Sequence, residues 1–302
     1  MQISTNRYYE RSNSQFQTLQ SQVDKLQEQI STGKKVSAPS DDAVAYQRLQ
    51  GLKQAGTDDA AWQGNITLAR TILQDTDSTL GNITDRLQQL QELAVQATTG
   101  TLSASDRLAL ANNVRSAIQD LVGLANTKDV RGQPLFGAAT GNTAVAVDAT
   151  TGVVSFSGTG SPASIPVGNG TSVQPSDTAA RIFGNIPTSA GGTTDTFALL
   201  SSFADALESG GPVSNAILTD LGAAVNQVTN VRSAAGARSA RLDVESARLT
   251  DVSLTRETER SALEDTDITT AITELQKTST VLQATQASFS KFSQLSLFDY
   301  IK

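Results

Sequence analysis

The sequence predicts a mainly α-helical, elongated rod, built from long antiparallel helices at both ends of the chain with a small β-rich domain inserted between them. Three observations lead to this fold class. Apolar residues near both termini recur at alternating spacings of three and four, two longer stretches continue that spacing inward, and the middle is rich in glycine and proline. Alternating spacing of this kind puts one apolar stripe on each helix, typical of helices that pack lengthwise against others.

The first helix is expected from about Ser12 to Thr32. Gly33 follows as its C-cap, since glycine readily adopts the left-handed conformation that ends many helices. Ser40-Asp41-Asp42 predicts the start of the next helix, where hydroxyl and carboxylate oxygens can accept hydrogen bonds from free backbone N–H groups. The stripe of the first helix contains five apolar residues: Phe16, Leu19, Val23, Leu26 and Ile30.

The most regular stripe of the chain runs from Trp62 to Ala97, alternating steps of four and three without a break. It predicts a helix of about 36 residues, or roughly 54 Å at 1.5 Å per residue. Ser103-Ala104-Ser105-Asp106 resembles a capping box and predicts the start of a third helix. One face of that helix carries Leu110, Val114, Ile118, Leu121 and Ala125.

Residues 137–212 differ in character, because they hold 12 of the 22 glycines and 5 of the 7 prolines. Residues 143–147, 153–156 and 163–167 are compatible with β-strands between turns, and 197–207 with a short helix. A flexible insertion is the alternative to a small β-rich domain. We favour the domain because several large apolar residues could form a core: Phe156, Ile165, Ile182, Phe183 and Ile186.

A second long heptad stripe runs from Leu218 to Leu263, interrupted by Arg232, Ser239, Ser246 and Arg260. A helix of about 50 residues would span roughly 75 Å. A compact globule of this chain length has a radius of gyration of only about 19 Å, so the sequence predicts a rod.

The C-terminal helix carries a weaker stripe, because Ser279 and Gln286 occupy positions within it. Its apolar members are Ile268, Ile272, Leu275, Leu282 and Phe289. Isolated helices of this length are marginal in water, so we expect the two terminal helices to pair with each other and to become fully ordered only among neighbouring subunits. An ordinary intramolecular bundle, in which the same stripes are simply core, is the alternative.

Composition excludes several kinds of chemistry. The chain has no cysteine and no histidine, which removes Ser–His and Cys–His catalysis, disulfides and the usual zinc sites, and no cofactor is expected. The net charge of −7 argues against nucleic acid and anionic membranes as partners. No stretch is long and apolar enough to span a membrane, and the N-terminus lacks the features of a cleaved signal peptide.

Clustered carboxylates provide the only basis for an enzymatic function. Paired acids can hydrolyse glycosides when their environments separate their pKa values. Here all three clusters lie near expected helix starts or on exposed faces, where acids cap helices or face solvent, so we expect no enzyme. The clusters are Asp41/Asp42, Asp58/Asp59 and Glu264/Asp265/Asp267.

Several ordered motifs resemble the signatures of the bacterial flagellin family. Near the N-terminus these are residues 26–36 (LQEQISTGKKV) with 38–43 (APSDDA), and 87–96 (LQQLQELAVQ) with 100–103 (GTLS). Residues 232–238 (RSAAGAR) resemble the C-terminal signature. Three further runs are similar to the hook-associated branch of the family, which joins the hook to the filament: residues 132–137, 263–267 and 295–302. Flagellin, the bulk filament subunit, is the alternative within the family, and an adhesin acting through the middle region is a third possibility.

The resemblance implies a division of the chain into an inner-tube helical domain (1–42 and 264–302), a rod helical domain (43–136 and 213–263) and a variable outer domain (137–212). It also implies export through the flagellar type III apparatus, without a cleaved signal, to the extracellular flagellum. Expected partners are other copies of the chain, the second hook-associated junction protein, flagellin and an export chaperone. The chaperone is expected to bind Leu275, Leu282, Phe289 and Phe292. Subunit contacts are expected at the two terminal stripes together with Phe292 and Leu295.

Overall fold

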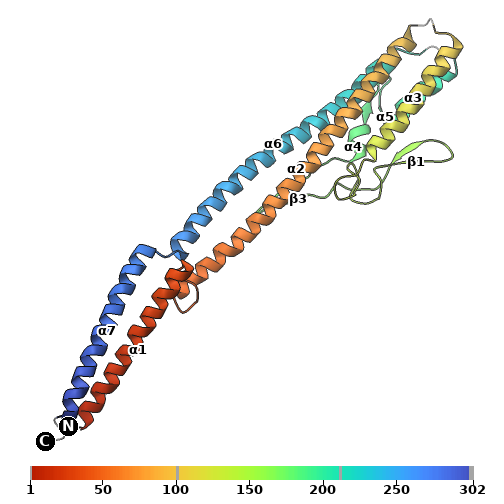
Figure 1. Ribbon diagram of the computed structural model, residues 1–302. Coiled ribbons are helices and arrows are strands. Elements are labelled where there is room, and N and C mark those ends of the chain that lie inside the picture. Colours follow the sequence, from red (N-terminus) through yellow and green to blue (C-terminus); the bar gives the residue numbers. More distant parts are fainter. Residues whose placement is uncertain (1, 100–101, 211–212, 299–302) are drawn as a thin grey trace. The chain divides into compact units, whose positions relative to one another are not determined.

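The computed structural model describes the backbone of residues 2–99, 102–210 and 213–298, and the side chains of 7–99, 102–210 and 213–291. The chain divides into two compact units. Unit 1 comprises Met1–Thr57 and Val252–Lys302, and unit 2 comprises Asp58–Asp251. Helices α2 (Ala43–Thr98) and α6 (Ala216–Glu264) contribute residues to both units (Figure 1). The domain boundaries expected from the family resemblance stay a prediction.

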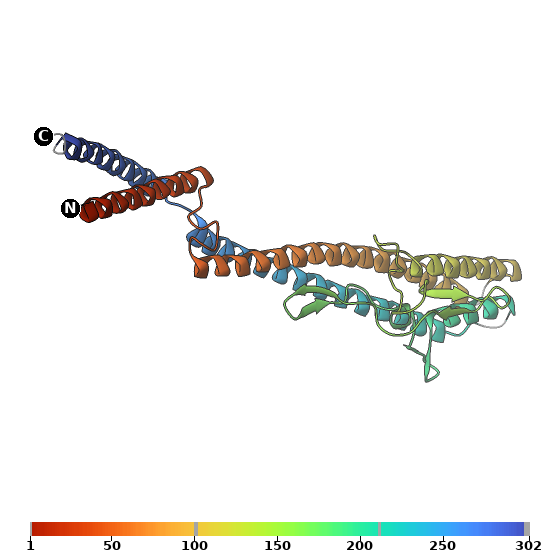
Figure 2. The ribbon, with the colours of Figure 1, turned by 90° about the horizontal axis from the view of Figure 1, so that it is seen from below.

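Unit 1 contains a helical hairpin made by the two ends of the chain. Helix α1 (Gln2–Thr32) and helix α7 (Ile268–Phe298) lie side by side in every view, with both termini at the same end (Figures 1 and 2). They are therefore antiparallel, as expected. Gly33 follows α1 with a φ of 70°, which confirms the expected glycine C-cap.

Helix α2 is 56 residues long and begins earlier than its regular stripe indicates. Its N-terminus is capped by Asp42, whose Oδ1 accepts hydrogen bonds from the backbone N–H groups of Val44 and Ala45. The expected start at residues 40–42 is thus confirmed. The interval between Asp42 and Trp62 proves to be helical as well, so one helix spans both features.

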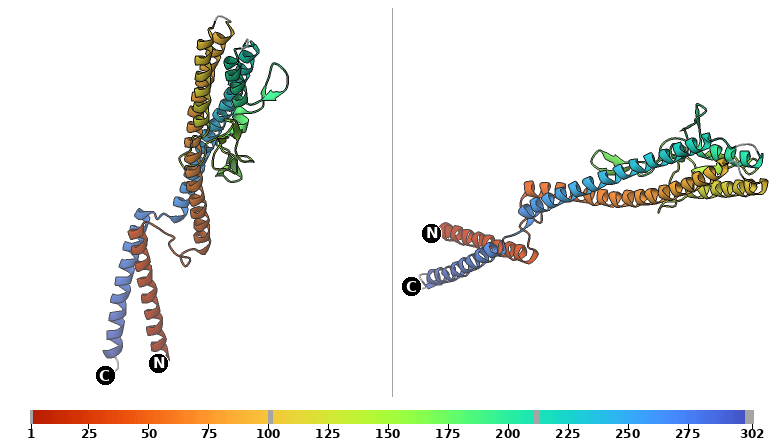
Figure 3. Two further views of the ribbon diagram at one scale, coloured as in Figure 1. Left: turned by 90° about the vertical axis from the view of Figure 1, so that its right-hand side faces the viewer. Right: turned by 90° about the horizontal axis from the view of Figure 1, so that it is seen from above.

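Unit 2 is built around the stripe of α2, in which every residue from Ile66 onward is buried: Ile66, Ala69, Leu73, Thr76, Leu80, Ile83, Leu87, Leu90, Ala94 and Ala97. Helix α3 (Ala104–Ala125) starts at the expected capping box, since Ser103 and Asp106 each accept from the other's backbone N–H. It packs against α5 (Thr196–Glu208), whereas α6 lies along α2 (Figure 3). The buried side chains of these helices form one contiguous core.

The middle region forms three separate antiparallel strand pairs rather than one sheet. They are β1 (Val145–Val147) with β2 (Val154–Phe156), β3 (Ile165–Gly168) with β4 (Thr171–Val173), and β5 (Ile186–Pro187) with β6 (Thr193–Thr194). The first three strands fall on the expected runs, and α5 on the expected helix. Strands β4 to β6 were not anticipated, because runs of two or three residues give no usable periodicity.

Four of the five apolar residues expected to form a core in the middle region are buried, and the fifth, Phe156, is partly buried against them. The ring centroids of Phe183 and Phe197 lie 4.9 Å apart, and those of Phe156 and Phe197 lie 6.4 Å apart. The short helix α4 (Ala179–Phe183) carries Phe183 and the buried Ile182. This cluster is continuous with the core of α2, α3 and α6, so the inserted strands share the core of unit 2.

Candidate assembly surface

The stripe of α1 is only partly buried within the chain. Val23 is buried, whereas Phe16, Leu19, Leu26 and Ile30 retain intermediate exposure. Phe16 packs edge-on against Phe289 of α7, with 5.5 Å between the ring centroids. The ring of Tyr9 approaches Phe289 in the same way at 5.4 Å. These aromatic contacts place the predicted stripes of the two terminal helices against each other.

On α7 three of the five residues expected on the stripe, Leu275, Leu282 and Phe289, lie on its least exposed face. Ile268 and Ile272 are 49% and 41% exposed. The least exposed residues follow the series Ala271, Leu275, Thr278, Ser279, Leu282, Thr285 and Phe289. Because alanine starts that series, side-chain size could not reveal its first turn, and the two isoleucines lie outside it in the folded chain. The side chains of Phe292 and Leu295 lie outside the described part of the chain.

The two connections that follow α1 and precede α7 are bonded to each other. The N–H of Lys35 donates to the carbonyl of Glu264 at 2.7 Å, and the N–H of Thr266 donates to the carbonyl of Gly33 at 2.8 Å. These bonds form an antiparallel bridge between Lys34 and Asp265. Two chain segments about 230 residues apart in sequence are thereby held in one register.

A buried carboxylate lies at this bridge. The Glu264 side chain is 3% exposed, and its oxygens lie 2.7 Å from Lys34 Nζ and 3.0 Å from an Arg260 guanidinium nitrogen. Lys53 Nζ of α2 is 3.8 Å away. The hydrogen bond from Lys34, together with the charges of Lys34, Lys53 and Arg260, lowers the pKa of Glu264 below its ordinary value. We call the bridge and this ion cluster (Gly33–Lys35, Lys53, Arg260 and Glu264–Thr266) the clasp.

The other acids singled out in unit 1 serve the local backbone. Asp41 accepts hydrogen bonds from the N–H groups of Ser37 and Ala38 and pairs with Lys25 at 3.0 Å. The Lys25 hydrogen bond and these backbone donors hold the pKa of Asp41 far below its usual range. Asp267 caps α7 by accepting from the N–H groups of two threonines, Thr269 and Thr270. Ion pairing and capping thus explain these carboxylates, in agreement with the sequence-based interpretation.

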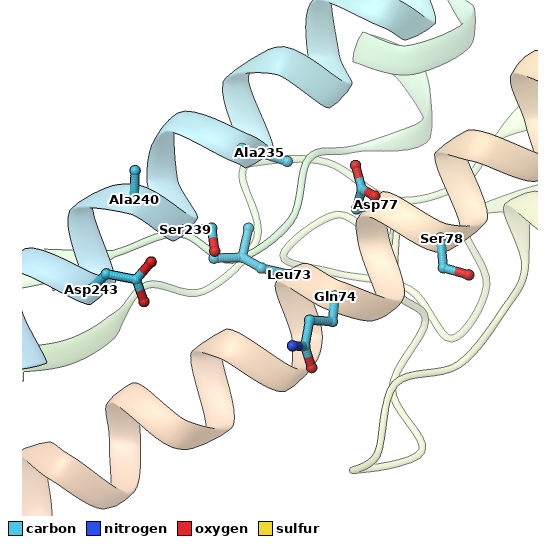
Figure 4. A pocket seen from close by; sticks show the side chains of 9 residues that line it. Leu73, Gln74, Asp77, Ser78, Ala235, Ser239, Ala240 and Asp243 are labelled. Carbon is cyan, nitrogen blue, oxygen red and sulfur yellow. The ribbon is translucent and has the colours of Figure 1, made fainter.

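In unit 2 a shallow groove runs between α2 and α6 (Figure 4). Both of its carboxylates are paired with arginine, Asp77 with Arg232 at 2.7 Å and Asp243 with Arg70. The Arg232 hydrogen bond lowers the pKa of Asp77, so this acid holds no proton to donate near neutral pH. Apart from Leu73, small or polar residues line the rest of the groove: Gln74, Ser78, Ala235, Gly236, Ser239 and Ala240.

Two models of one protein family match most of the chain. The model of the bacterial flagellin N-terminal helical region matches residues 3–140, and that of the C-terminal helical region matches residues 218–301. The chain belongs to the bacterial flagellin family. Within the family, flagellar hook-associated protein 3 of Escherichia coli K12 is 30% identical over the full length of both chains. The protein of the same name from Salmonella typhimurium is 28% identical over 99% of both chains.

Other members of the flagellin family are also similar. A flagellin of Listeria innocua is 27% identical over 89% of this chain and 86% of its own. Among solved structures, hook-associated protein 3 of Legionella pneumophila superposes with a TM-score of 0.66 at 17% identity, covering 71% of this chain and 98% of its own. At that identity the likeness establishes the fold. Across the described residues, no helix is both long and apolar enough to cross a bilayer.

The clasp is the feature of this family member that sequence reasoning missed. The sequence showed the Gly33 cap and the acidic cluster at residues 264–267 as separate features. Only the fold brings Lys34 and Glu264 within 2.7 Å of each other.

Proposed function

We propose that this flagellin-family protein is a hook–filament junction subunit. It is exported through the flagellar type III apparatus and assembles outside the cell through its terminal helices. The observation that carries this proposal is the match to two hook-associated protein 3 sequences along 99–100% of each chain. Flagellin is the alternative, since the Listeria flagellin is only slightly less similar, at 27% identity over a smaller share of both chains. The proposed partners are further copies, the second hook-associated junction protein and flagellin.

Incomplete burial of the terminal hairpin supports a role in assembly. Among the described side chains, Val23 is the only buried residue of α1 and Ala271 the only buried residue of α7. Several large apolar groups of the hairpin stay exposed, namely Tyr8, Ile268, Ile272 and Val281. A hairpin with so little core gains stability when neighbouring subunits cover its outer faces. The interface then comprises the two stripes, Ile268 and Ile272 included, and extends to Phe292 and Leu295.

The stripe of α7 also provides a binding surface for the proposed export chaperone. Leu275, Leu282 and Phe289 are partly covered in the folded chain, and Phe289 contacts α1 directly. A chaperone that binds these residues and Phe292 must therefore hold α7 apart from α1. Such a complex would keep the C-terminal segment open for export and prevent premature assembly in the cytoplasm.

Gene deletion with electron microscopy tests the junction role. We expect cells to carry hooks without filaments and to shed monomeric flagellin into the medium. If the chain were flagellin, the medium would instead lack the filament protein. Complementation with Ile268→Asp/Ile272→Asp should fail to restore filaments, because two charges would be placed at the proposed interface. Val153→Asp, at an exposed apolar position just before β2, is the matched control and should restore them.

A further inference from the structure

A tight turn after α3 displays an apolar side chain to solvent. The N–H of Gly132 donates to the carbonyl of Asp129 at 2.9 Å, and Gly132 has a φ of 76°. Aspartate in the first position and glycine in the fourth are favoured in such a turn, but nothing local requires a β-branched residue in the second. Val130 occupies that position and is 62% exposed. We call residues 127–135 the tip loop.

The hydrogen bonds of one buried aspartate hold the tip loop in a single conformation. The Asp129 side chain is 3% exposed and accepts from the N–H groups of Arg131 and Gln133 at 2.8 and 3.0 Å. The Arg131 guanidinium donates to it twice more, at 2.9 and 2.7 Å. Phe136, fully buried just after the loop, anchors it in the core of unit 2. A partner that covers Val130 therefore does not have to order the loop first.

The charge beside Val130 differs from that of the surrounding unit. Residues 58–251 contain 11 basic and 18 acidic side chains, and so a net charge of −7, whereas unit 1 contains 12 of each. Lys128 is the only lysine in the sequence of unit 2, and it is exposed. Among the described residues, no carboxylate pairs with it. The tip loop is thus a basic surface with an apolar centre on a strongly acidic unit.

A surface of α2 has the opposite charge. Asp85, Glu92 and Val95 are spaced seven and three residues apart, which places them on one face of the helix. All three are exposed, Val95 by 53%, and no cation of the described residues pairs with Glu92. We call these three residues the outer patch of α2. A single exposed valine is ordinary, but here each of two valines has an unpaired charge nearby, and the two charges are opposite.

We propose that the tip loop of one copy docks on the outer patch of α2 in a second copy. Val130 covers Val95 in this contact. Lys128 pairs with Glu92, so that charge complementarity selects the acidic patch over other apolar positions.

The two surfaces lie at different levels of unit 2, which makes the contact one between unlike surfaces. Arg86 of α2 pairs with Asp120 of α3 and so fixes one common level. Val95 lies nine residues, or about 14 Å, beyond Arg86 toward the end of α2. The tip loop follows α3, which runs back along α2 from that end, and so it lies on the other side of the level. Contacts between unlike surfaces repeat from copy to copy and generate rings or filaments.

The proposal rests on the proposed assembly role, but it involves unit 2 and does not use the terminal stripes. It also holds whether the assembly is a junction or a filament. A test that detects contact between copies therefore separates its failure from failure of the junction role.

Disulfide crosslinking in assembled flagella is that test, because the chain has no cysteine of its own. Cells lacking the gene are complemented with Val95→Cys/Val130→Cys, and their isolated flagella are oxidised. A disulfide forms only where the two Cα atoms approach within about 7 Å. We expect covalent dimers and larger oligomers of the subunit, at least about ten-fold above either single variant.

Val130→Cys/Val153→Cys is the matched control, because Val153 is 60% exposed in another part of unit 2. It should give no dimers above background. Assembled flagella without crosslinks in Val95→Cys/Val130→Cys would overturn the proposal. Equal dimer formation by Val130→Cys alone would also overturn it, since two tip loops would then meet each other. Crosslinks to a different protein would assign the tip loop to that protein instead.

Charge reversal keeps the proposal testable if the cysteine variants fail to assemble. Lys128→Glu and Glu92→Lys should each reduce the number of filaments per cell about five-fold, and the double variant should restore at least about half of them. Arg241→Glu combined with Glu92→Lys is the control, because Arg241 is exposed on α6, and it should restore none. Normal filament numbers in both single variants, or no rescue in the double variant, would contradict the contact.

Discussion

The terminal stripe of α1 and the long stripe of α2 have the same heptad spacing but very different burial. From Ile66 to Ala97 every stripe residue of α2 is buried, whereas only Val23 is buried among the five of α1. Helix α2 has α6, α3 and the middle region around it, while α1 has α7. Periodicity therefore reports which face of a helix is apolar, and the number of neighbouring elements determines how far that face is covered.

The largest effect should come from truncating the α2 stripe. Leu87→Ala removes a side chain with 0% exposure and leaves a cavity in the core of unit 2. We expect a loss of about 3–4 kcal/mol in the free energy of unfolding, measured by urea denaturation followed by circular dichroism. A loss below about 1 kcal/mol would contradict the conclusion that the α2 stripe, unlike the α1 stripe, forms a fully packed core.

A smaller effect is expected where the middle region is attached to α6. The Asp177 side chain is 2% exposed and pairs with Arg238 of α6 at 2.8 Å and with Arg181 at 2.9 Å. Asp177→Ala should cost about 2 kcal/mol, because Arg238 loses its buried partner. Protease cleavage within residues 140–195 should become faster than in the wild type. Asp195→Glu, which keeps a capping carboxylate on α5, is a control that should leave the cleavage rate unchanged.

Acidification should affect unit 1 through the clasp. The pKa of Glu264 is lowered by folding, so its contribution to stability is present above its ordinary value of 4.5 and is lost as the pH falls below that value. We expect the terminal hairpin to lose helical signal as the pH falls below about 4.5, and Glu264→Gln to lose most of this dependence. The same pH dependence in Glu264→Gln and wild type would locate the acid sensitivity elsewhere.

The smallest change in monomer stability should come from the terminal stripe. Phe16→Ala removes a partly covered ring that contacts Phe289. In the monomer it should cost about 1 kcal/mol or less, yet it should sharply reduce sedimentable polymer under assembly conditions. A large loss in the monomer with normal assembly would favour an ordinary intramolecular bundle.

Much of the helical framework was predictable because long periodic stripes and capping residues act locally. Gly33, the Ser103 capping box and the helix expected to be about 50 residues long, observed as Ala216–Glu264, all correspond to features of the sequence. The polar residues that interrupt the α6 stripe could be identified from the sequence, but the residues that they bind could not. Arg232 binds Asp77 across 155 residues of sequence, and Ser246 accepts a hydrogen bond from Gln63 across 183.

The sequence by itself determined the helices, their apolar faces and the family, because these depend on spacing and on residues close together in the chain. Only the tertiary structure decided which residues are covered in the first turns of α7, how the short strands pair and that Glu264 joins Lys34 at a buried site. Those features depend on residues brought together from distant parts of the chain, and small or charged side chains give no local sign of the partner they will meet.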